Sequence, residues 1–192
     1  MHWTCCHTAD FSAQALQEVY SRLSPTRKVH IDRFHRHEDK LRSLAAEALL
    51  QRLLQERCGI TDAVLHRKSN GQPYLTGCDL YVSISHCGEM VACAVSEIPV
   101  GIDIEHIRPI RLNLVRQVCV EEEKAYLLAG KSPEEDTPCT DRDILERFFE
   151  IWTAKEAYFK KCGTGITDLK SVNILTLSRQ MHRVDDYMIQ LV

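Results

Sequence analysis

The chain has 192 residues, of which 27 are acidic and 24 are basic, and its formal net charge at pH 7 is −3. This length allows one large domain or two small ones with a real core, and the acidic balance argues against a protein that coats nucleic acid. Nine cysteines without a C-x-x-C pair, no export signal and no membrane-length apolar run favour a cytoplasmic protein with reduced thiols.

The first third of the chain is predicted to be mainly helical. After a strand over 2–7, apolar residues at helical spacing predict a helix over 12–23. A second helix, over 25–34, starts with the cap and first-turn pair Ser-Pro. Its many cations form either a solvated basic face or an anion site. The strongest helical pattern covers 37–58, and a glycine follows it.

The remaining elements are predicted from turn chemistry and alternation. Asn70-Gly71 indicates a turn, and the alternating segment 80–95 indicates a hairpin that turns at 87–89. The later segments are predicted to be a helix from 121 to 130, a flexible loop over 131–140, a long helix over 139–162, and closing strands over 172–177 and 187–192.

Two carboxylates alternate in the segment Gly101-Ile102-Asp103-Ile104-Glu105. Because a strand has a side-chain period of two, Asp103 and Glu105 point to the same face. Their repulsion is removed most simply by a hard divalent cation such as Mg²⁺, and oxygen-only sites also accept Mn²⁺. Glu156, four residues before Lys160 on one helix face, is the predicted third ligand. A metal site and a solvated strand face are the two interpretations of this pattern.

The segment Gly-Ile-Asp-Ile-Glu is followed about fifty residues later by Trp-Thr-Ala-Lys-Glu-Ala-x-x-x-Lys. This ordered pair resembles the signature of the 4′-phosphopantetheinyl transferases, most closely the surfactin-synthetase-activating type. The resemblance covers about 20–175. It implies an α+β fold with two pseudo-symmetric halves, about 1–97 and 98–192, and an active site in the cleft between them. The N-terminal half would contact the phosphates and adenine of coenzyme A, and the C-terminal half would carry the metal and catalytic residues.

The resemblance also implies which residues of the N-terminal half contact the coenzyme. By position, Arg42 offers a cation to the 3′-phosphate, with Arg27 and His30 on the preceding helix as helpers. The pair Ser85-His86 before the hairpin turn matches another family hallmark. Both of these side chains are implied to touch the phosphates of the coenzyme and neighbouring groups.

The sequence departs from the family pattern in two places. The family loop usually reads Gly-Lys-Pro, whereas Gln72 stands at the lysine position here. We therefore expect a weaker contact with the coenzyme phosphate, or a contact supplied by Lys68 instead. Members of this type also usually continue with a further strand beyond the point where this sequence stops.

The implied reaction transfers the 4′-phosphopantetheine arm of coenzyme A to a serine of an apo acyl or peptidyl carrier protein and releases 3′,5′-ADP. Our hypothesis is that Glu156, or a water that it polarises, accepts the serine proton, while Lys160 stabilises charge on the phosphates. Lys155 would lie nearby as a second cation. We expect a monomer that engages neither nucleic acid nor membrane. A catalytically silent coenzyme-A-binding protein and a metal-dependent nuclease are the alternatives.

Overall fold

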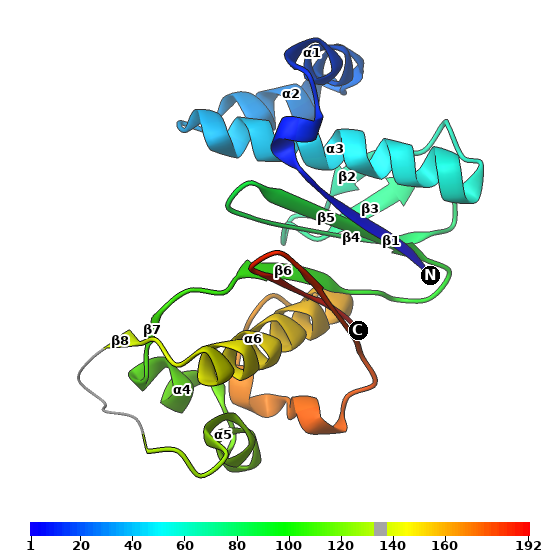
Figure 1. Ribbon diagram of the computed structural model, residues 1–192. Helices are drawn as coiled ribbons and strands as arrows, with labels where there is room; N and C mark the ends of the chain where they lie inside the picture. The colour runs from blue at the N-terminus through cyan, green and yellow to red at the C-terminus, as the bar shows by residue number, and fades with distance from the viewer. Residues whose placement is uncertain (133–137) are drawn as a thin grey trace. The chain divides into compact units, whose positions relative to one another are not determined.

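The computed structural model describes residues 1–132 and 138–192. The chain divides into two compact units, Met1–Val100 and Gly101–Val192. Each unit contains a three-stranded antiparallel sheet and one long helix that packs against it (Figure 1). This architecture confirms the α+β class predicted from the sequence.

Three helices follow the first strand of unit 1: α1 (Ala13–Arg22), α2 (Pro25–Asp32) and α3 (His37–Cys58). Ser12 and Ser24 cap the first two helices, since each side chain accepts a hydrogen bond from a backbone N–H of the first turn. Gly59 ends α3 in the left-handed conformation, with a φ of 68°. The three helices predicted in this part of the chain are therefore confirmed.

The main sheet of unit 1 has the order β1 (His2–His7), β5 (Met90–Ser96), β4 (Tyr81–Cys87). The central strand β5 is buried along its whole length, and α3 packs against it. A separate hairpin is formed by β2 (Val64–Arg67) and β3 (Pro73–Thr76). The predicted hairpin over 80–95 corresponds to β4 and β5, so this prediction is confirmed.

The sheet of unit 2 has the order β6 (Ile102–His106), β10 (Tyr187–Leu191), β9 (Gln180–Val184). The long helix α6 (Arg142–Cys162) packs against both β6 and β10. The other elements of this unit are β7 (Ile110–Arg111), α4 (Asn113–Val118), α5 (Glu121–Leu128), β8 (Pro138–Cys139) and the 3-10 turns η2 (Leu169–Ser171) and η3 (Ile174–Thr176).

Gly101, just before β6, allows the strand to approach α6 closely. A β-carbon at this position would lie 1.8 Å from the carbonyl oxygen of Ala157 and 2.9 Å from the backbone nitrogen of Lys161. Because side chains alternate along a strand, Asp103 and Glu105 point toward α6 as Gly101 does. The missing side chain of one residue therefore sets the spacing at which the two carboxylates meet the helix.

Two predictions of secondary structure differ from the structure, and several strands were not predicted. The predicted strand over 172–177 is wrong, because Asp168 and Asn173 accept backbone hydrogen bonds that form the 3-10 turns η2 and η3. The long helix begins at Arg142 rather than at 139, because Asp141 caps it. The strands β2, β3, β7, β8 and β9 were not predicted.

Part of the loop predicted over 131–140 lies outside the described residues. Within the described part, residues 138–139 pair with β7 as the short strand β8. Among the residues described, no helix has the length and apolarity that crossing a membrane requires.

Candidate active site

Asp103 is almost completely buried, with 1% of its surface exposed, on the face of β6 that packs against α6. Its Oδ1 accepts a hydrogen bond from the Nζ of Lys160 at 2.6 Å, so the two form an ion pair. The Lys160 side chain keeps 31% of its surface exposed. The structure thus joins a buried carboxylate to a cation that still reaches solvent.

Glu156 lies one helical turn before Lys160 and is half-buried. The pKa of its carboxyl is raised to about 7. Burial is the largest cause and the charge of Asp103 adds to it, while Lys160 acts in the opposite direction. The charge of Glu105 contributes a smaller increase of this pKa. Within unit 2, Glu156 is therefore close enough to feel the charges of the other three predicted site residues, Asp103, Glu105 and Lys160.

Glu105 points to the same face as Asp103 but has a different partner. The guanidinium of Arg108 donates from Nη1 to Glu105 Oε2 at 3.0 Å and also lies over the ring of Phe149. Sequence reasoning missed Arg108, although a basic residue three positions after an acidic one is a recognisable signal for an ion pair. This arginine partly neutralises the outer end of the carboxylate group.

The carboxylates are close without forming a preassembled metal site. Within residues 1–132 and 138–192, no group of three or more His, Cys, Asp or Glu side chains is arranged to hold a metal ion. The ammonium of Lys160 instead bonds to Asp103. The donor set still fits a hard divalent cation chemically, because all three candidate ligands, Asp103, Glu105 and Glu156, supply carboxylate oxygens.

Lys155 does not lie beside the carboxylates as predicted. It is completely buried, and its Nζ donates to the carbonyl oxygens of Val118 and Leu169, each at 2.8 Å, and pairs with Glu123 Oε2 at 2.6 Å. Adjacent residues of a helix point about 100° apart, so Lys155 and Glu156 face different surroundings. The prediction of a coenzyme contact is therefore corrected to a structural role within unit 2.

Trp152 packs against the hydrophobic core of unit 2, where its ring stacks on Phe148 with centroids 6.1 Å apart. Its position one turn before Glu156 places it on the same helix face as the candidate base. It supports α6 through packing.

In unit 1, the structure brings Arg42 to the hairpin that carries Ser85 and His86. The guanidinium of Arg42, on α3, donates from Nη1 to the carbonyl oxygen of Gly88 at 3.0 Å and also pairs with Asp39. Ser85 is buried and His86 is exposed, as expected for neighbouring positions on opposite faces of β4. A cation therefore lies at the turn immediately after Ser85 and His86.

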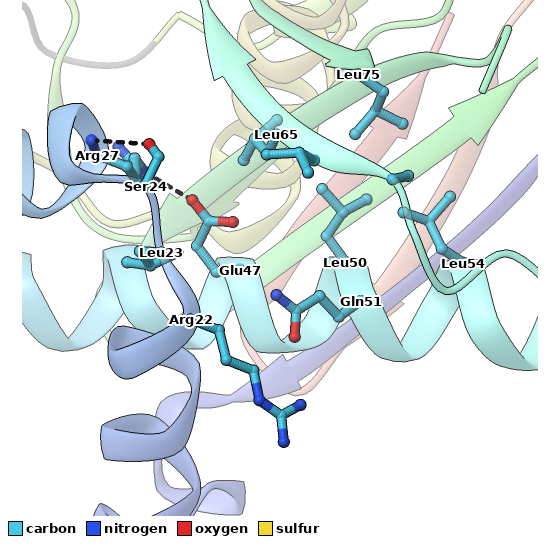
Figure 2. A pocket seen from close by; sticks show the side chains of 12 residues that line it. Arg22, Leu23, Ser24, Arg27, Glu47, Leu50, Gln51, Leu54, Leu65 and Leu75 are labelled. Carbon is cyan, nitrogen blue, oxygen red and sulfur yellow. Dashed lines mark hydrogen bonds and ion pairs between the residues drawn. The ribbon is translucent and has the colours of Figure 1, made fainter. Parts of the chain in front are cut away.

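Arg27 is buried, with 8% of its surface exposed, whereas an arginine that binds an anion from solvent needs an exposed guanidinium. Its Nε donates to Glu47 Oε1 at 2.6 Å and its Nη2 donates to the Ser43 hydroxyl at 2.9 Å. Arg27 and Glu47 line a cavity of about 70 Å³, whose lining also includes Leu65 and Leu75 (Figure 2). Burial raises the pKa of Glu47, although Arg27 opposes this shift. Nη1 of Arg27 has no hydrogen-bond partner among the described residues.

His30 lies in a positively charged region. Partial burial lowers the pKa of its imidazole, and the charges of Arg27, Arg67 and Arg33 lower it further. Arg33 belongs to the cation-rich segment 25–34 noted in the sequence, whereas sequence reasoning missed Arg67 as a neighbour. Arg67 belongs to the β2–β3 hairpin, whose approach to α2 no local sequence pattern indicates.

Gln72 closes the loop between β2 and β3 together with Lys68. The Nζ of Lys68 donates to Gln72 Oε1 at 2.9 Å, and the backbone of Lys68 bonds to Gln72 and Gly71. The structure thus places an ammonium group directly beside the glutamine at the predicted phosphate-contacting position.

Two family models together match nearly the whole chain. Residues 9–98 match the model described as 4′-phosphopantetheinyl transferase, N-terminal, and residues 99–187 match the 4′-phosphopantetheinyl transferase superfamily. With its α+β units and its group of acidic residues beside a lysine, the chain belongs to the 4′-phosphopantetheinyl transferase superfamily.

Curated relatives carry the same family name. The chain is 33% identical over 148 residues to the 4′-phosphopantetheinyl transferase gsp of Aneurinibacillus migulanus, covering 76% of this chain and 58% of the relative. It is 28% identical over 159 residues to Sfp of Bacillus subtilis, with coverages of 81% and 67%. It is 29% identical over 168 residues to the 4′-phosphopantetheinyl transferase HetI of a Nostoc species, with coverages of 83% and 67%. The matched part spans about three fifths to two thirds of the length of these relatives.

Proposed function

We propose that the protein transfers the 4′-phosphopantetheine group of coenzyme A to a serine hydroxyl of an apo acyl or peptidyl carrier protein and releases 3′,5′-ADP. The observation that carries this proposal is the group formed by Asp103, Glu156 and Lys160, in which a carboxyl with a pKa of about 7 lies near a partly exposed lysine side chain. Membership of the transferase superfamily supports the same reaction.

In this proposal Glu156 is the general base. A base is most effective when its pKa lies near the working pH, and a pKa of about 7 meets this condition at neutral pH. The serine hydroxyl loses its proton to Glu156, directly or through one water, as its oxygen attacks the β-phosphorus of the coenzyme. The bond from that phosphorus to the bridging oxygen breaks, and 3′,5′-ADP leaves with the bonding electrons.

In this proposal the ammonium group of Lys160 forms an ion pair with a phosphate of coenzyme A. Its ammonium pairs with Asp103 but remains 31% exposed, so a rotation of its side chain brings it to a bound anion. Such preorganised positive charge stabilises the charge that develops on the leaving diphosphate oxygen.

The proposed metal is Mg²⁺, with Mn²⁺ as an equivalent, held by Asp103, Glu105 and Glu156 together with phosphate oxygens. Three carboxylates from two facing elements, with charge repulsion already expressed in the pKa of Glu156, suit a hard cation. When bound, the ion neutralises charge on the diphosphate and orients it.

The proposed coenzyme contacts of unit 1 are Arg42, His30, Ser85 and His86, with Lys68 next to Gln72. The position of Arg42 at the turn after His86 supports the assignments of Arg42 and His86. Lys68 supplies the charge that Gln72 lacks. In the proposal, unit 1 therefore binds the phosphates and adenine, and unit 2 carries the metal and the catalytic residues.

The remaining parts of the proposal concern the setting of the reaction. Because one chain carries both sets of residues, the proposed enzyme works as a monomer, in the cytoplasm, with coenzyme A and a carrier protein as its partners. The candidate carriers are those of fatty-acid, polyketide and peptide synthesis. A nuclease is disfavoured by the net charge of −3, since nucleic-acid binding depends on positive charge.

The test measures 3′,5′-ADP by chromatography after incubation with coenzyme A, Mg²⁺ and an apo carrier protein. We expect nucleotide release that depends on the carrier, and none with a carrier whose acceptor serine is replaced by alanine. Binding of coenzyme A without release across several carriers would instead indicate a silent binding protein. Nicking of plasmid DNA in the same buffer would indicate the nuclease.

A further inference from the structure

Gln190, on β10, is a completely buried amide whose role the site described above does not explain. It has 0% of its surface exposed, and neither Nε2 nor Oε1 has a hydrogen-bond partner among the residues that the structure describes. Such unsatisfied buried groups are rare in native proteins and destabilise the fold. A buried amide that makes no hydrogen bond in one state of a protein is explained when it gains a partner in another.

The register of the sheet places Gln190 directly opposite Asp103. The two residues are cross-strand partners in the antiparallel pairing of β10 with β6. Side chains that oppose each other in this way point to the same face and have Cβ atoms about 5 Å apart. Met188, two residues earlier on β10, belongs to the core that α6 also lines. Gln190 therefore occupies the same layer as Asp103, between the sheet and α6.

Lys160 connects this arrangement to the proposed reaction. Its ammonium is bonded to Asp103 Oδ1, yet it is also the cation that we assign to the substrate phosphate. When Lys160 moves to the phosphate, the Asp103 carboxylate loses this bond while only 1% exposed. A buried carboxylate that loses one of its hydrogen-bond donors is held less firmly in one orientation, and a neutral donor beside it restores that orientation.

We propose that Gln190 is a positioning residue for Asp103, whose side-chain amide donates a hydrogen bond to the Asp103 carboxylate once Lys160 has left it. This inference rests on the proposed function, in which Lys160 binds the substrate phosphate. Gln190 then holds the orientation of Asp103 during the reaction, although it touches neither the coenzyme nor the carrier protein.

The chemistry of the amide suits this task. A lysine at the same position would add a second charge and compete with a metal ion for the carboxylate, and a glutamate would repel it. A neutral donor orients the carboxylate without removing its negative charge, which is how residues behind metal ligands act. A leucine or methionine would fill the same space, but it would offer no hydrogen bond.

The test is a double-mutant cycle of Gln190→Met and Lys160→Met, followed by urea unfolding without coenzyme, carrier or metal. In the wild-type background we expect Gln190→Met to raise the unfolding midpoint, because it removes an amide that lacks partners. In the Lys160→Met background we expect it to lower the midpoint, because the amide then bonds to Asp103. Met188→Leu, on the same face of β10, is the control and should shift both midpoints equally.

A shift of the same sign and size in both backgrounds overturns the proposal. If Lys160→Met does not fold, the deciding measurement is the calorimetric affinity of Gln190→Met for Mn²⁺. We expect binding at least about tenfold weaker than in the wild type, and unchanged affinity overturns the proposal. Because the unfolding cycle needs no substrate, a failure of phosphopantetheine transfer is distinguishable from a failure of this pairing.

Discussion

Glu156 combines a half-buried position with two acidic neighbours, and its pKa is raised from 4.5 to about 7. The folded protein therefore keeps a proton on this carboxyl over a range of pH in which the unfolded chain has lost it. The stability contributed by the bound proton is full below about pH 4.5 and is lost as the pH rises through 7. The ionised form of this carboxyl therefore exists at a cost in stability in the folded protein.

This shift predicts how Glu156→Gln changes the pH dependence of unfolding. Between pH 5 and pH 8 in EDTA, the wild-type free energy of unfolding should fall by an amount on the order of 3 kcal/mol from this group. In the Glu156→Gln variant that contribution should be absent, because glutamine does not ionise. Urea unfolding at both pH values checks this. Equal pH dependence in the two proteins would show that Glu156 titrates normally.

Gln72 offers a second prediction at the scale of the residue. Replacing it with lysine adds an ammonium next to Lys68, which donates to Gln72 in the wild type. If this loop reaches a phosphate of coenzyme A, Gln72→Lys should tighten binding about tenfold in a calorimetric titration. Gln72→Met, which removes the acceptor without adding charge, is the matched control. Identical affinities of the lysine and methionine variants would place the loop away from the phosphate.

At the scale of the element, the buried pair Lys155–Glu123 fixes α6 within unit 2. Glu123 accepts hydrogen bonds from the backbone N–H groups of Val120 and Ile174, and Lys155 donates to carbonyl oxygens of Val118 and Leu169. One ion pair therefore connects the helix to α5, the end of α4, η2 and η3. The orientation of α6 in turn determines where Glu156 and Lys160 point.

Removing one member of this pair should destabilise the fold strongly. Lys155→Met leaves the Glu123 carboxylate buried without its cation, so we expect the free energy of unfolding to fall by about 3–5 kcal/mol. The double variant Lys155→Met with Glu123→Leu should regain part of this loss, because no buried charge is left unpaired. A small effect of Lys155→Met in urea unfolding would contradict the structural assignment.

The approach of β6 to α6 gives another prediction at this scale. The β-carbon introduced by Gly101→Ala collides with the Ala157 carbonyl, so the strand and helix must separate. We expect the free energy of unfolding to fall by about 1–3 kcal/mol, which is the usual cost of overpacking. Transfer activity should also fall, since Asp103 follows two residues later. Gly71→Ala, at an open turn with positive φ, controls for the effect of losing a glycine.

The helices were predictable because each carries its own signals. Ser24-Pro25 starts α2 and Gly59 ends α3 at the expected positions. The strand β9 was missed because its sequence, Gln-Met-His-Arg-Val, lies partly exposed at the edge of a sheet and does not alternate cleanly. Its pairing with β10 is a tertiary property that the local sequence does not contain.

The part of the candidate site that depends on the spacing of residues along one strand and one helix was predictable. Alternation on β6 and helical spacing on α6 correctly placed Asp103 near Glu156 and Lys160. The predicted position of Lys155 was wrong because its partner, Glu123, lies 32 residues earlier in the sequence, and no local pattern connects the two. Gln190 was missed for the same reason, since its importance comes from the register of β10 with β6.

At the scale of the whole molecule, the chain consists of two units with separate hydrophobic cores. The two family models meet between residues 98 and 99, close to the division between the units after Val100. Each unit contributes a sheet, a long helix and a distinct set of charges. The proposed reaction assigns coenzyme binding to the first set and metal binding and proton transfer to the second.

Intact-mass spectrometry of an apo carrier protein incubated with this protein, coenzyme A and Mg²⁺ tests the proposed transfer most directly. We expect the carrier to gain the mass of one phosphopantetheine group, and the gain to disappear with EDTA or with Asp103→Asn, which keeps the shape of the side chain but removes its charge. An unmodified carrier, across fatty-acid, polyketide and peptide-synthetase types, would contradict the proposal even if coenzyme A binds.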